Sequence, residues 1–199
     1  MFPDFLENPS DVAAPLLLGC TLTRTITLNG EKHKLVARIV ETEAYDQDDP
    51  ASHAFGGPSE RNAAMFGPAG HLYVYVSYGM HHCCNVVCGP EGFGSGCLVR
   101  AVEPLEGVEV MRELREAGRA RKRPLKLRDF TNGPGKVCAA LDIDKGLYGH
   151  DLTVEPLVLE FAPLLPGETI GSSPRVGISK NIDAPKRFFI EGNEFVSRA

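Results

Sequence analysis

Two carboxylates and a phenol occupy every second position of the segment Glu41-Thr42-Glu43-Ala44-Tyr45. The preceding Ile39-Val40 pair is β-branched and favours a strand, so Glu41, Glu43 and Tyr45 should share one face. Burying two carboxylates on one face costs free energy unless nearby groups compensate. The segment therefore has two interpretations: a solvent-facing strand edge, or a general base held beside an aromatic wall.

Arg100 and the acidic residues near Glu43 define the electrostatic alternatives. Arg100 lies on a strand predicted from Cys97 to Val102 and is a candidate partner for the Glu43 carboxylate. The acidic residues between Glu41 and Asp49 could instead bind a divalent cation, but they lack the calcium-loop spacing around a central glycine. We therefore expect a solvated acidic turn after Glu43.

Three aromatic side chains, Tyr45, His53 and Tyr75, could form two walls of a slot for a flat ring. An electron-poor or cationic ring would bind best between such faces. Tyr78 and Met80 flank a glycine at the predicted tip of a hairpin, where they could wedge into a stacked duplex. The alternatives are a tyrosine-rich sheet core and a histidine that is an ordinary surface residue of its loop.

A cluster of potential zinc ligands follows the hairpin tip, in His81-His82-Cys83-Cys84 and Cys88. Successive side chains of a strand point to opposite faces, so these five cannot converge on one ion. The sequence also contains no pair of Cys-x2-Cys knuckles. We predict neither a metal site nor a cofactor.

The composition is typical of a globular chain. With 199 residues, 43% of them hydrophobic and 24% charged, the chain fits one domain with a sizeable core. No apolar run approaches the roughly 20 residues of a membrane helix, and the N-terminal residues lack the order of a secretory signal. The six cysteines suit buried, reduced thiols. We expect a cytoplasmic protein with no membrane partner.

Positive charge is concentrated in one segment, although the formal net charge is −5. Eight basic and two acidic residues lie between Arg112 and Arg128, which could contact a polyanion or form a solvated helix and loop. Lys136 follows Gly133-Pro134-Gly135 at the start of a predicted helix, where a glycine-rich turn can hold a phosphate.

The elements that must position these residues follow from alternation and turn signals. Asn29-Gly30 predicts a hairpin between strands Thr21–Leu28 and Lys34–Glu43. A second hairpin joins Leu72–Tyr78 to His82–Cys88, after a long polar loop over 46–70. Helices are predicted within 8–19, 106–117 and 132–141, and short strands within 152–196. The predicted fold class is α+β: a single mixed domain, residues 1–199, around a curved antiparallel β-sheet with flanking helices and a protruding β-hairpin.

An ordered set of motifs, spanning 10–196, resembles the alkyladenine (3-methyladenine) DNA glycosylase family. The motifs are Arg38-Ile39-Val40-Glu41-Thr42-Glu43-Ala44-Tyr45, the loop residue His53, Tyr73-Val74-Tyr75 with Tyr78-Gly79-Met80, Leu98-Val99-Arg100-Ala101-Val102-Glu103-Pro104-Leu105-Glu106-Gly107, and Gly133-Pro134-x-Lys136. Each motif alone is weak, whereas the ordered set is specific. The residues after the hairpin tip, His81-His82-Cys83-Cys84, are less aromatic than the family's pattern.

For catalysis, the resemblance implies that Glu43 activates water, helped by Arg100 and by the backbone carbonyl of Val176. The carboxylate would take a proton from water attacking C1′ of an alkylated or deaminated purine nucleotide and would favour the oxocarbenium-like sugar. No lysine occupies a position that suggests a Schiff base. We therefore predict a monofunctional DNA repair glycosylase that hydrolyses the N-glycosidic bond and leaves an abasic site.

For the base pocket, the resemblance implies that Tyr45 and His53 form one wall and Tyr75 the other. Asn85 would crowd the exocyclic amino group of guanine. The base would reach this pocket only by flipping out of the duplex. Selection among 3-methyladenine, 7-methylguanine, hypoxanthine and ethenoadenine depends on the pocket's shape and stays open.

For DNA binding, the resemblance implies that Tyr78 fills the gap left by the flipped nucleotide, with Met80 beside it. Lys136 and the 112–128 segment are candidates for phosphate contacts. The expected partner is double-stranded DNA containing damaged purines, bound by a compact, monomeric, nucleoid-associated bacterial enzyme. A non-catalytic nucleic-acid binding module is the alternative. A carbohydrate hydrolase using Glu41 and Glu43 ranks last, because same-face neighbours on one strand do not flank a sugar.

Overall fold

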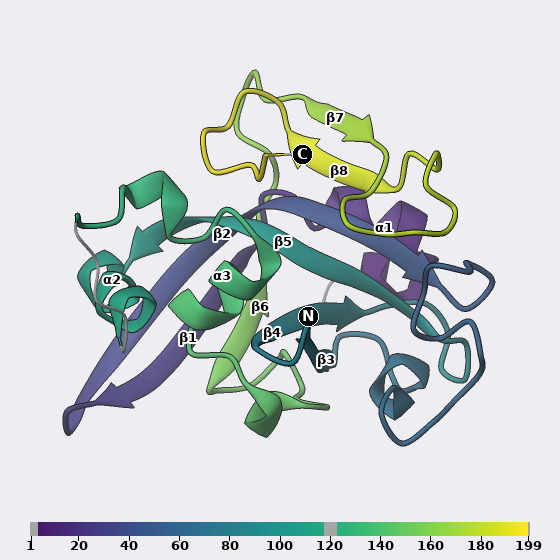
Figure 1. Cartoon of the computed structure of the whole chain (residues 1–199), viewed down its shortest axis with the longest axis horizontal. Helices are drawn as coiled ribbons and strands as arrows, with labels where there is room; N and C mark the ends of the chain where they lie inside the picture. Colours follow the sequence, from purple (N-terminus) through teal and green to yellow (C-terminus); the bar gives the residue numbers. More distant parts are fainter. Residues whose placement is uncertain (1–3, 118–122, 199) are drawn as a thin grey trace.

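In the computed structural model, the chain is described over residues 4–117 and 123–198. The strands are β1 (Thr21–Leu28), β2 (Glu31–Asp46), β3 (Leu72–Ser77), β4 (His81–Val87), β5 (Ser95–Glu106), β6 (Leu157–Glu160), β7 (Ile170–Ser173) and β8 (Arg187–Ile190). The α-helices are α1 (Ser10–Leu16), α2 (Val108–Glu116) and α3 (Pro134–Ala140), and the 3₁₀ helices are η1 (Asp4–Glu7), η2 (Ala63–Phe66), η3 (Leu127–Asp129) and η4 (Lys145–Leu147). The predicted α+β class is confirmed (Figure 1).

All of these strands join one antiparallel sheet. Its main path runs β3-β4-β5-β2-β1-β6, and β8 attaches to β2 with β7 alongside. The long strand β2 pairs with β1 up to Arg38 and with β8 from Glu41, while β5 accompanies it along most of its length. Because β2 changes neighbours midway, the sheet curls, and β7 and β8 lie above β2 and β5 in Figure 1.

The β2–β5 pairing is irregular where β2 changes neighbours. Ile39 pairs with Val102, Glu41 with Ala101 and Thr42 with Val99, so the register shifts on both sides of Glu41. Such bulges bend a strand and re-aim side chains, and they are common beside active sites. Here the register shifts lie where the part of β2 around Glu41 pairs with β5, the strand that carries Arg100.

The core lies between the sheet and its helices. The helix α1 packs against β2 and β5, whereas α3 packs against β4 and β5 and α2 packs against α3. A small second cluster, formed by Ala54, Met65, Tyr73 and Val87, supports the loop after β2. The cysteines are all buried and free.

Most predicted elements are present, with different ends. The first hairpin turns at Asn29 and Gly30, both with positive φ, and β1 has the predicted bounds. β2 and β5 are longer than predicted, so Tyr45 lies within β2. The predicted helix end at Gly118 lies outside the described residues, as do Arg119, Arg121 and Lys122 of the basic segment. None of the helices in the described ranges is both long and apolar enough to cross a bilayer.

Candidate active site

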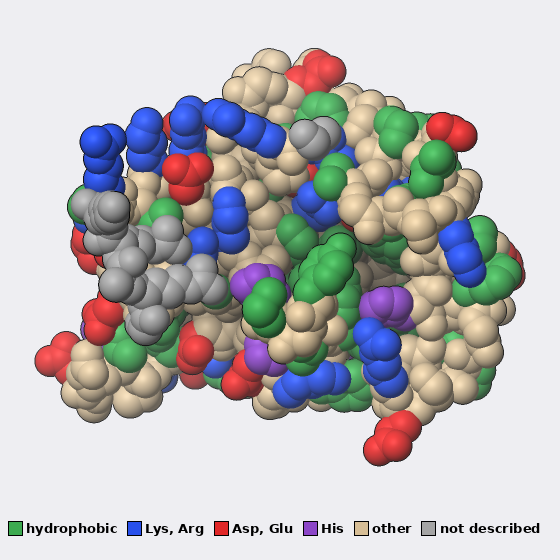
Figure 2. All heavy atoms as spheres, viewed as in Figure 1, with side chains coloured by type: hydrophobic (Ala, Val, Ile, Leu, Met, Phe, Trp, Pro, Cys, Tyr) green, Lys and Arg blue, Asp and Glu red, His purple; other side chains and the backbone are tan. Residues whose placement is uncertain are grey.

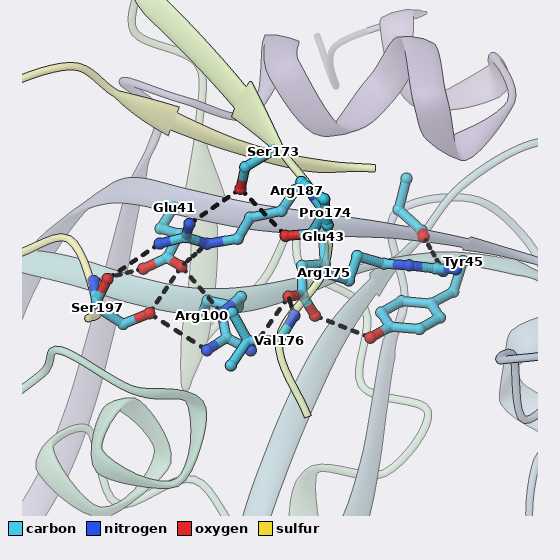
Figure 3. A network of polar contacts seen from close by, with 11 residues as sticks. Glu41, Glu43, Tyr45, Arg100, Ser173, Pro174, Arg175, Val176, Arg187 and Ser197 are labelled. Atoms are coloured by element: carbon cyan, nitrogen blue, oxygen red, sulfur yellow. Dashed lines mark hydrogen bonds and ion pairs between the residues drawn. The ribbon is translucent and has the colours of Figure 1, made fainter. Parts of the chain in front are cut away.

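Glu43 is fully buried, and its carboxylate has polar partners on three different segments. The Tyr45 hydroxyl donates to Oε2 at 2.8 Å, and the backbone N–H of Val176 donates to Oε1 at 2.8 Å. Arg100 Nη1 lies 3.2 Å from Oε1 (Figure 3). The carboxylate is therefore held by groups from β2, from β5 and from the segment after β7. The interpretation of this face as a solvent-facing strand edge is wrong.

Glu41 is the second buried carboxylate, and it holds the other side of Arg100. Its Oε1 lies 2.9 Å from Arg100 Nε and 2.6 Å from Arg187 Nε, and the Ser197 backbone N–H donates to Oε2 at 2.6 Å. We call Glu41, Glu43, Arg100, Arg187 and Ser197 the charged cluster (Figure 3). Two guanidinium groups face two carboxylates in it, which is how buried charges are stabilised in a protein interior.

The cluster keeps Arg100 charged. Burial by itself lowers the pKa of Arg100, but Glu43 and then Glu41 more than offset this effect, so the net shift is upward. Burial, followed by the charge of Glu43, raises the pKa of Tyr45 well above its usual range. Tyr45 therefore remains a hydroxyl donor to Glu43.

Arg175 packs over the ring of Tyr45. Its guanidinium carbon lies 4.5 Å from the centre of the Tyr45 ring, and Nη1 donates to the Ala44 carbonyl at 2.9 Å. Arg175 is buried and forms an ion pair with buried Asp49 at 2.7 Å. Asp46 likewise accepts hydrogen bonds from Ser10 and Ser95. The prediction of a solvated acidic turn is therefore wrong for Asp46 and Asp49.

A cavity of about 570 Å³ opens onto this cluster. Eight predicted site residues line it: Glu43, Tyr45, His53, Tyr75, Tyr78, Asn85, Arg100 and Val176. Its volume lies within the range of small-molecule sites in proteins. On the face seen in Figure 2, hydrophobic side chains gather at the centre beside a hollow. The tertiary structure thus brings together residues that are up to 133 positions apart in the chain.

The aromatic side chains of the cavity are in mutual contact. Tyr73 and Tyr75 stack with ring centres 5.6 Å apart, and the His53 ring meets Tyr75 edge-on at 4.6 Å. His53 Nδ1 also lies 2.9 Å from the Tyr73 hydroxyl oxygen. Burial, followed by the charge of Arg61, lowers the pKa of His53. The ring of His53 therefore touches Tyr75 directly, and the assignment of these residues to opposite walls stays a prediction.

Asn85 is buried on β4, and its side-chain amide lies 3.4 Å from the Tyr73 carbonyl oxygen. It borders the cavity beside Leu98, with which it pairs across the sheet. A side chain so confined can exclude groups of the wrong shape, but its predicted action on guanine stays a prediction.

The predicted DNA-contacting residues lie at the cavity's edge and beyond it. β3 and β4 pair in antiparallel register, and the turn between them, Tyr78-Gly79-Met80, is called the hairpin tip below. Tyr78 is 84% exposed and Met80 is 74% exposed. Tyr78 lines the cavity, whereas Met80 and Lys136 are not among its lining residues.

Two of the predicted phosphate-binding residues are engaged within the protein. Lys136 is half-buried, and its Nζ lies 2.6 Å from Asn132 Oδ1. Arg115, from the basic segment, is buried and donates to the Phe130 carbonyl at 2.7 Å. The burial of Arg115 therefore does not support a phosphate contact for this residue.

The sequence alone did not point to Arg187, Ser197 or Arg175, and for Asp49 it suggested a solvated turn or a cation site rather than a buried ion pair with Arg175. Arg187 and Ser197 lie 146 and 156 residues from Glu41, with which they form hydrogen bonds. Their local sequence carries no charge pattern that would indicate a buried partner. For Val176, a role of the backbone carbonyl was predicted, and the structure adds a hydrogen bond from its N–H to Glu43.

The site thus combines a buried carboxylate, paired with an arginine, with a cavity that aromatic side chains line. The chain belongs to the methylpurine-DNA glycosylase family, whose model matches residues 4–194. It is therefore a DNA glycosylase, an N-glycosyl hydrolase with DNA as its substrate.

Individual relatives cover most of the chain. A protein of Nitrosospira multiformis, named "Putative 3-methyladenine DNA glycosylase", is 46% identical over 98% of this chain and 92% of its own length. Proteins of the same name are 49% identical in Agrobacterium fabrum, over 80% of this chain and 77% of theirs, and 43% identical in Carboxydothermus hydrogenoformans, over 94% and 93%.

Proposed function

We propose that this DNA glycosylase takes an alkylated or deaminated purine nucleotide out of the duplex and hydrolyses its N-glycosidic bond with water activated by Glu43. The observation that carries the proposal is the placement of Glu43, a buried carboxylate on the wall of the aromatic cavity. A base inside a stacked duplex could not reach this carboxylate, so the nucleotide would have to flip.

The proposed water would bind to Glu43 at an acceptor position that the protein does not use. A carboxylate offers about four acceptor positions. Tyr45 donates to Oε2, Val176 donates to Oε1 and Arg100 pairs with Oε1, and we propose that the attacking water binds at the remaining position of Oε2. As the water attacks C1′, Glu43 accepts its proton, and the electron pair of the breaking bond leaves with the base. The negative charge also favours the oxocarbenium-like sugar.

The remaining predicted residues would position the substrate. We propose that Tyr45 and His53 face Tyr75 across the base, and that Asn85 disfavours the exocyclic amino group of guanine. A base held between rings needs about 7 Å between them, because aromatic groups stack about 3.5 Å apart. The His53 ring, now 4.6 Å from Tyr75, would then have to shift when the base enters. The Val176 carbonyl would be a further contact of the water.

The hairpin tip suits insertion into DNA. Exposed apolar side chains at a turn can replace an extruded base in the stack, and inserted wedges of this kind occur in DNA-bending proteins. We propose this role for Tyr78, with Met80 beside it. Lys136 and the described basic residues of the 112–128 segment other than Arg115 would contact phosphates. Lys180, an exposed lysine on the cavity lining, is a further candidate.

The first test is an excision assay on duplexes that each carry one damaged purine, such as hypoxanthine or ethenoadenine. The expected result is release of the base, followed by strand cleavage only after alkali. Binding without release would favour the non-catalytic module. Trapping with borohydride would reveal a lysine Schiff base, and a trapped adduct lost in Lys180→Met would overturn the monofunctional prediction.

The proposed enzyme works as a monomer on DNA that contains damaged purines, and its substrate would place it at the nucleoid. Gel filtration with light scattering tests the first point, for which a mass near 21.6 kDa is expected. A mass twice as large would contradict the monomer.

A further inference from the structure

Ser197, near the C-terminal end of the described chain, bonds the charged cluster at several points. Its N–H donates to Glu41 Oε2 at 2.6 Å and its hydroxyl to Glu41 Oε1 at 2.8 Å. Arg187 Nη2 donates to the Ser197 carbonyl at 2.9 Å. The backbone and side chain of this serine are thus both bound within the cluster (Figure 3).

Ser197 also contacts Arg100 directly. Arg100 Nη2 donates to the Ser197 hydroxyl oxygen at 3.2 Å, while Nε faces Glu41 and Nη1 faces Glu43. The three nitrogen atoms of one guanidinium therefore have three different partners. Because a guanidinium is planar and its donors are fixed in direction, these partners determine which nitrogen points at Glu43.

Ser197 does not line the cavity, so it would act only through the groups that it touches. It is 7% exposed, and Glu41 and Arg100 separate it from Glu43. Losing its hydroxyl would leave Arg100 Nη2 without this acceptor and Glu41 Oε1 without one of its donors. In a buried cluster such a loss weakens the neighbouring charge-assisted hydrogen bonds as well.

We propose that Ser197 is a positioning residue for base excision, which orients Arg100 toward Glu43 through its bonds to Arg100 and Glu41. The inference rests on the proposed function, in which Glu43 activates the water. It assigns part of the catalytic geometry to the C-terminal segment, which bonds to β2 through Glu41 and to β5 through Arg100 and Glu103.

The test compares Ser197→Ala, Ser197→Thr and the matched control Ser173→Ala. Ser173 accepts a hydrogen bond from Arg187 Nη1 at 3.0 Å, so its hydroxyl touches the same cluster without touching Arg100 or Glu41. Single-turnover excision at saturating enzyme is measured together with the dissociation constant for the damaged duplex. If Ser197 had only a structural role, its loss would not lower the excision rate while leaving the dissociation constant unchanged.

For Ser197→Ala we expect excision to slow about 10-fold with an affinity unchanged within about twofold, the size of effect that fits one hydrogen bond to a charged group. Ser197→Thr keeps the hydroxyl and should restore most of the rate, and Ser173→Ala, which removes an acceptor of Arg187 but no partner of Arg100 or Glu41, should slow excision clearly less than Ser197→Ala. A full rate in Ser197→Ala, or equal losses in Ser197→Ala and Ser173→Ala, would overturn the inference.

Ser197→Cys provides a second measurement if Ser197→Ala does not fold. A thiol preserves most of the volume but is a weaker donor and acceptor, so we expect an intermediate rate. Equal rates for Ser197→Cys and the wild type would also overturn the inference. The proposed function fails separately: it is contradicted if the wild-type protein excises none of the damaged purines.

Discussion

The charged cluster is buried and bonded to protein groups throughout, whereas the hairpin tip exposes 84% of Tyr78 and 74% of Met80. Both regions border the same cavity through Glu43 and Tyr78. The difference follows from what each must do. Charges that stabilise a transition state act best when they are already oriented and shielded from water. A wedge must stay apolar and accessible until DNA covers it.

The two regions also differ in what holds them. Each member of the charged cluster has partners from distant parts of the chain, so its geometry depends on the complete fold. Tyr78 has a positive φ of 50° in the turn between β3 and β4, and its side chain extends into solvent. Substitutions in the cluster should therefore affect catalysis or stability strongly, whereas substitutions at the tip should affect mainly DNA binding.

The largest effect is expected for Glu43→Gln. Removing a general base costs about 10²–10⁴-fold in rate, and the amide retains the shape needed for binding. Single-turnover excision should fall by this factor while the affinity for the damaged duplex persists. Glu91→Gln, which changes an exposed glutamate outside the cavity lining, is the matched control. Full activity of Glu43→Gln would refute the assignment of the base.

Glu41→Leu should lower the free energy of unfolding by about 3–5 kcal/mol, because it leaves buried arginines without their carboxylate. Urea denaturation followed by circular dichroism measures this loss. The matched control is Glu106→Leu, on β5. It removes a carboxylate that pairs with Lys34, and both side chains of this pair are 56% exposed. That control should cost no more than about 1 kcal/mol. Equal losses in the two variants would remove the distinction between the charged cluster and the surface.

Tyr78→Ser should weaken binding of the damaged duplex about 10-fold, since stacking of a base on an aromatic side chain contributes about 1–3 kcal/mol. The free energy of unfolding should not change, because the side chain has no packing to lose. Fluorescence anisotropy with a labelled duplex measures the affinity. Leu165→Ser is the control, since Leu165 is 58% exposed and does not line the cavity. Unchanged affinity in Tyr78→Ser would contradict the wedge role.

The smallest effect is expected for His53. Burial and Arg61 lower its pKa in the folded protein, so the unfolded chain binds a proton more readily. Its contribution to stability is therefore present above its ordinary pKa of about 6.5 and is lost as pH falls toward the lowered value. The solvent-exposed part of the side chain keeps this contribution small.

When the pH is lowered from about 7.5 to about 5.5, the melting temperature of His53→Gln should fall less than that of the wild type. His33→Gln, at a position on β2 that does not line the cavity, is the control. An identical pH dependence in His53→Gln and the wild type would contradict this account.

Local patterns in the sequence predict much of the fold. Asn29-Gly30 indicated the first hairpin, and alternation over Glu41-Thr42-Glu43-Ala44-Tyr45 placed both carboxylates and the phenol on one face. The structure confirms the hydrogen bond that this spacing allows between Tyr45 and Glu43. The sequence indicates Arg100 as a candidate partner of Glu43, because its strand and its charge are both evident, and the structure shows the ion pair.

Other properties depended on contacts that no local pattern encodes. Whether Glu41 and Glu43 faced water or the interior was decided by Arg187, Ser197 and the Val176 N–H, which reach them from more than 130 residues away. Local sequence patterns also do not predict the register shifts around Glu41 or the ion pair between Arg175 and Asp49. The sequence by itself determined the reactive groups and the strands that carry them, because alternation is a short-range property. Only the tertiary structure decided their burial and orientation, because these depend on charged and polar groups brought together from distant parts of the chain.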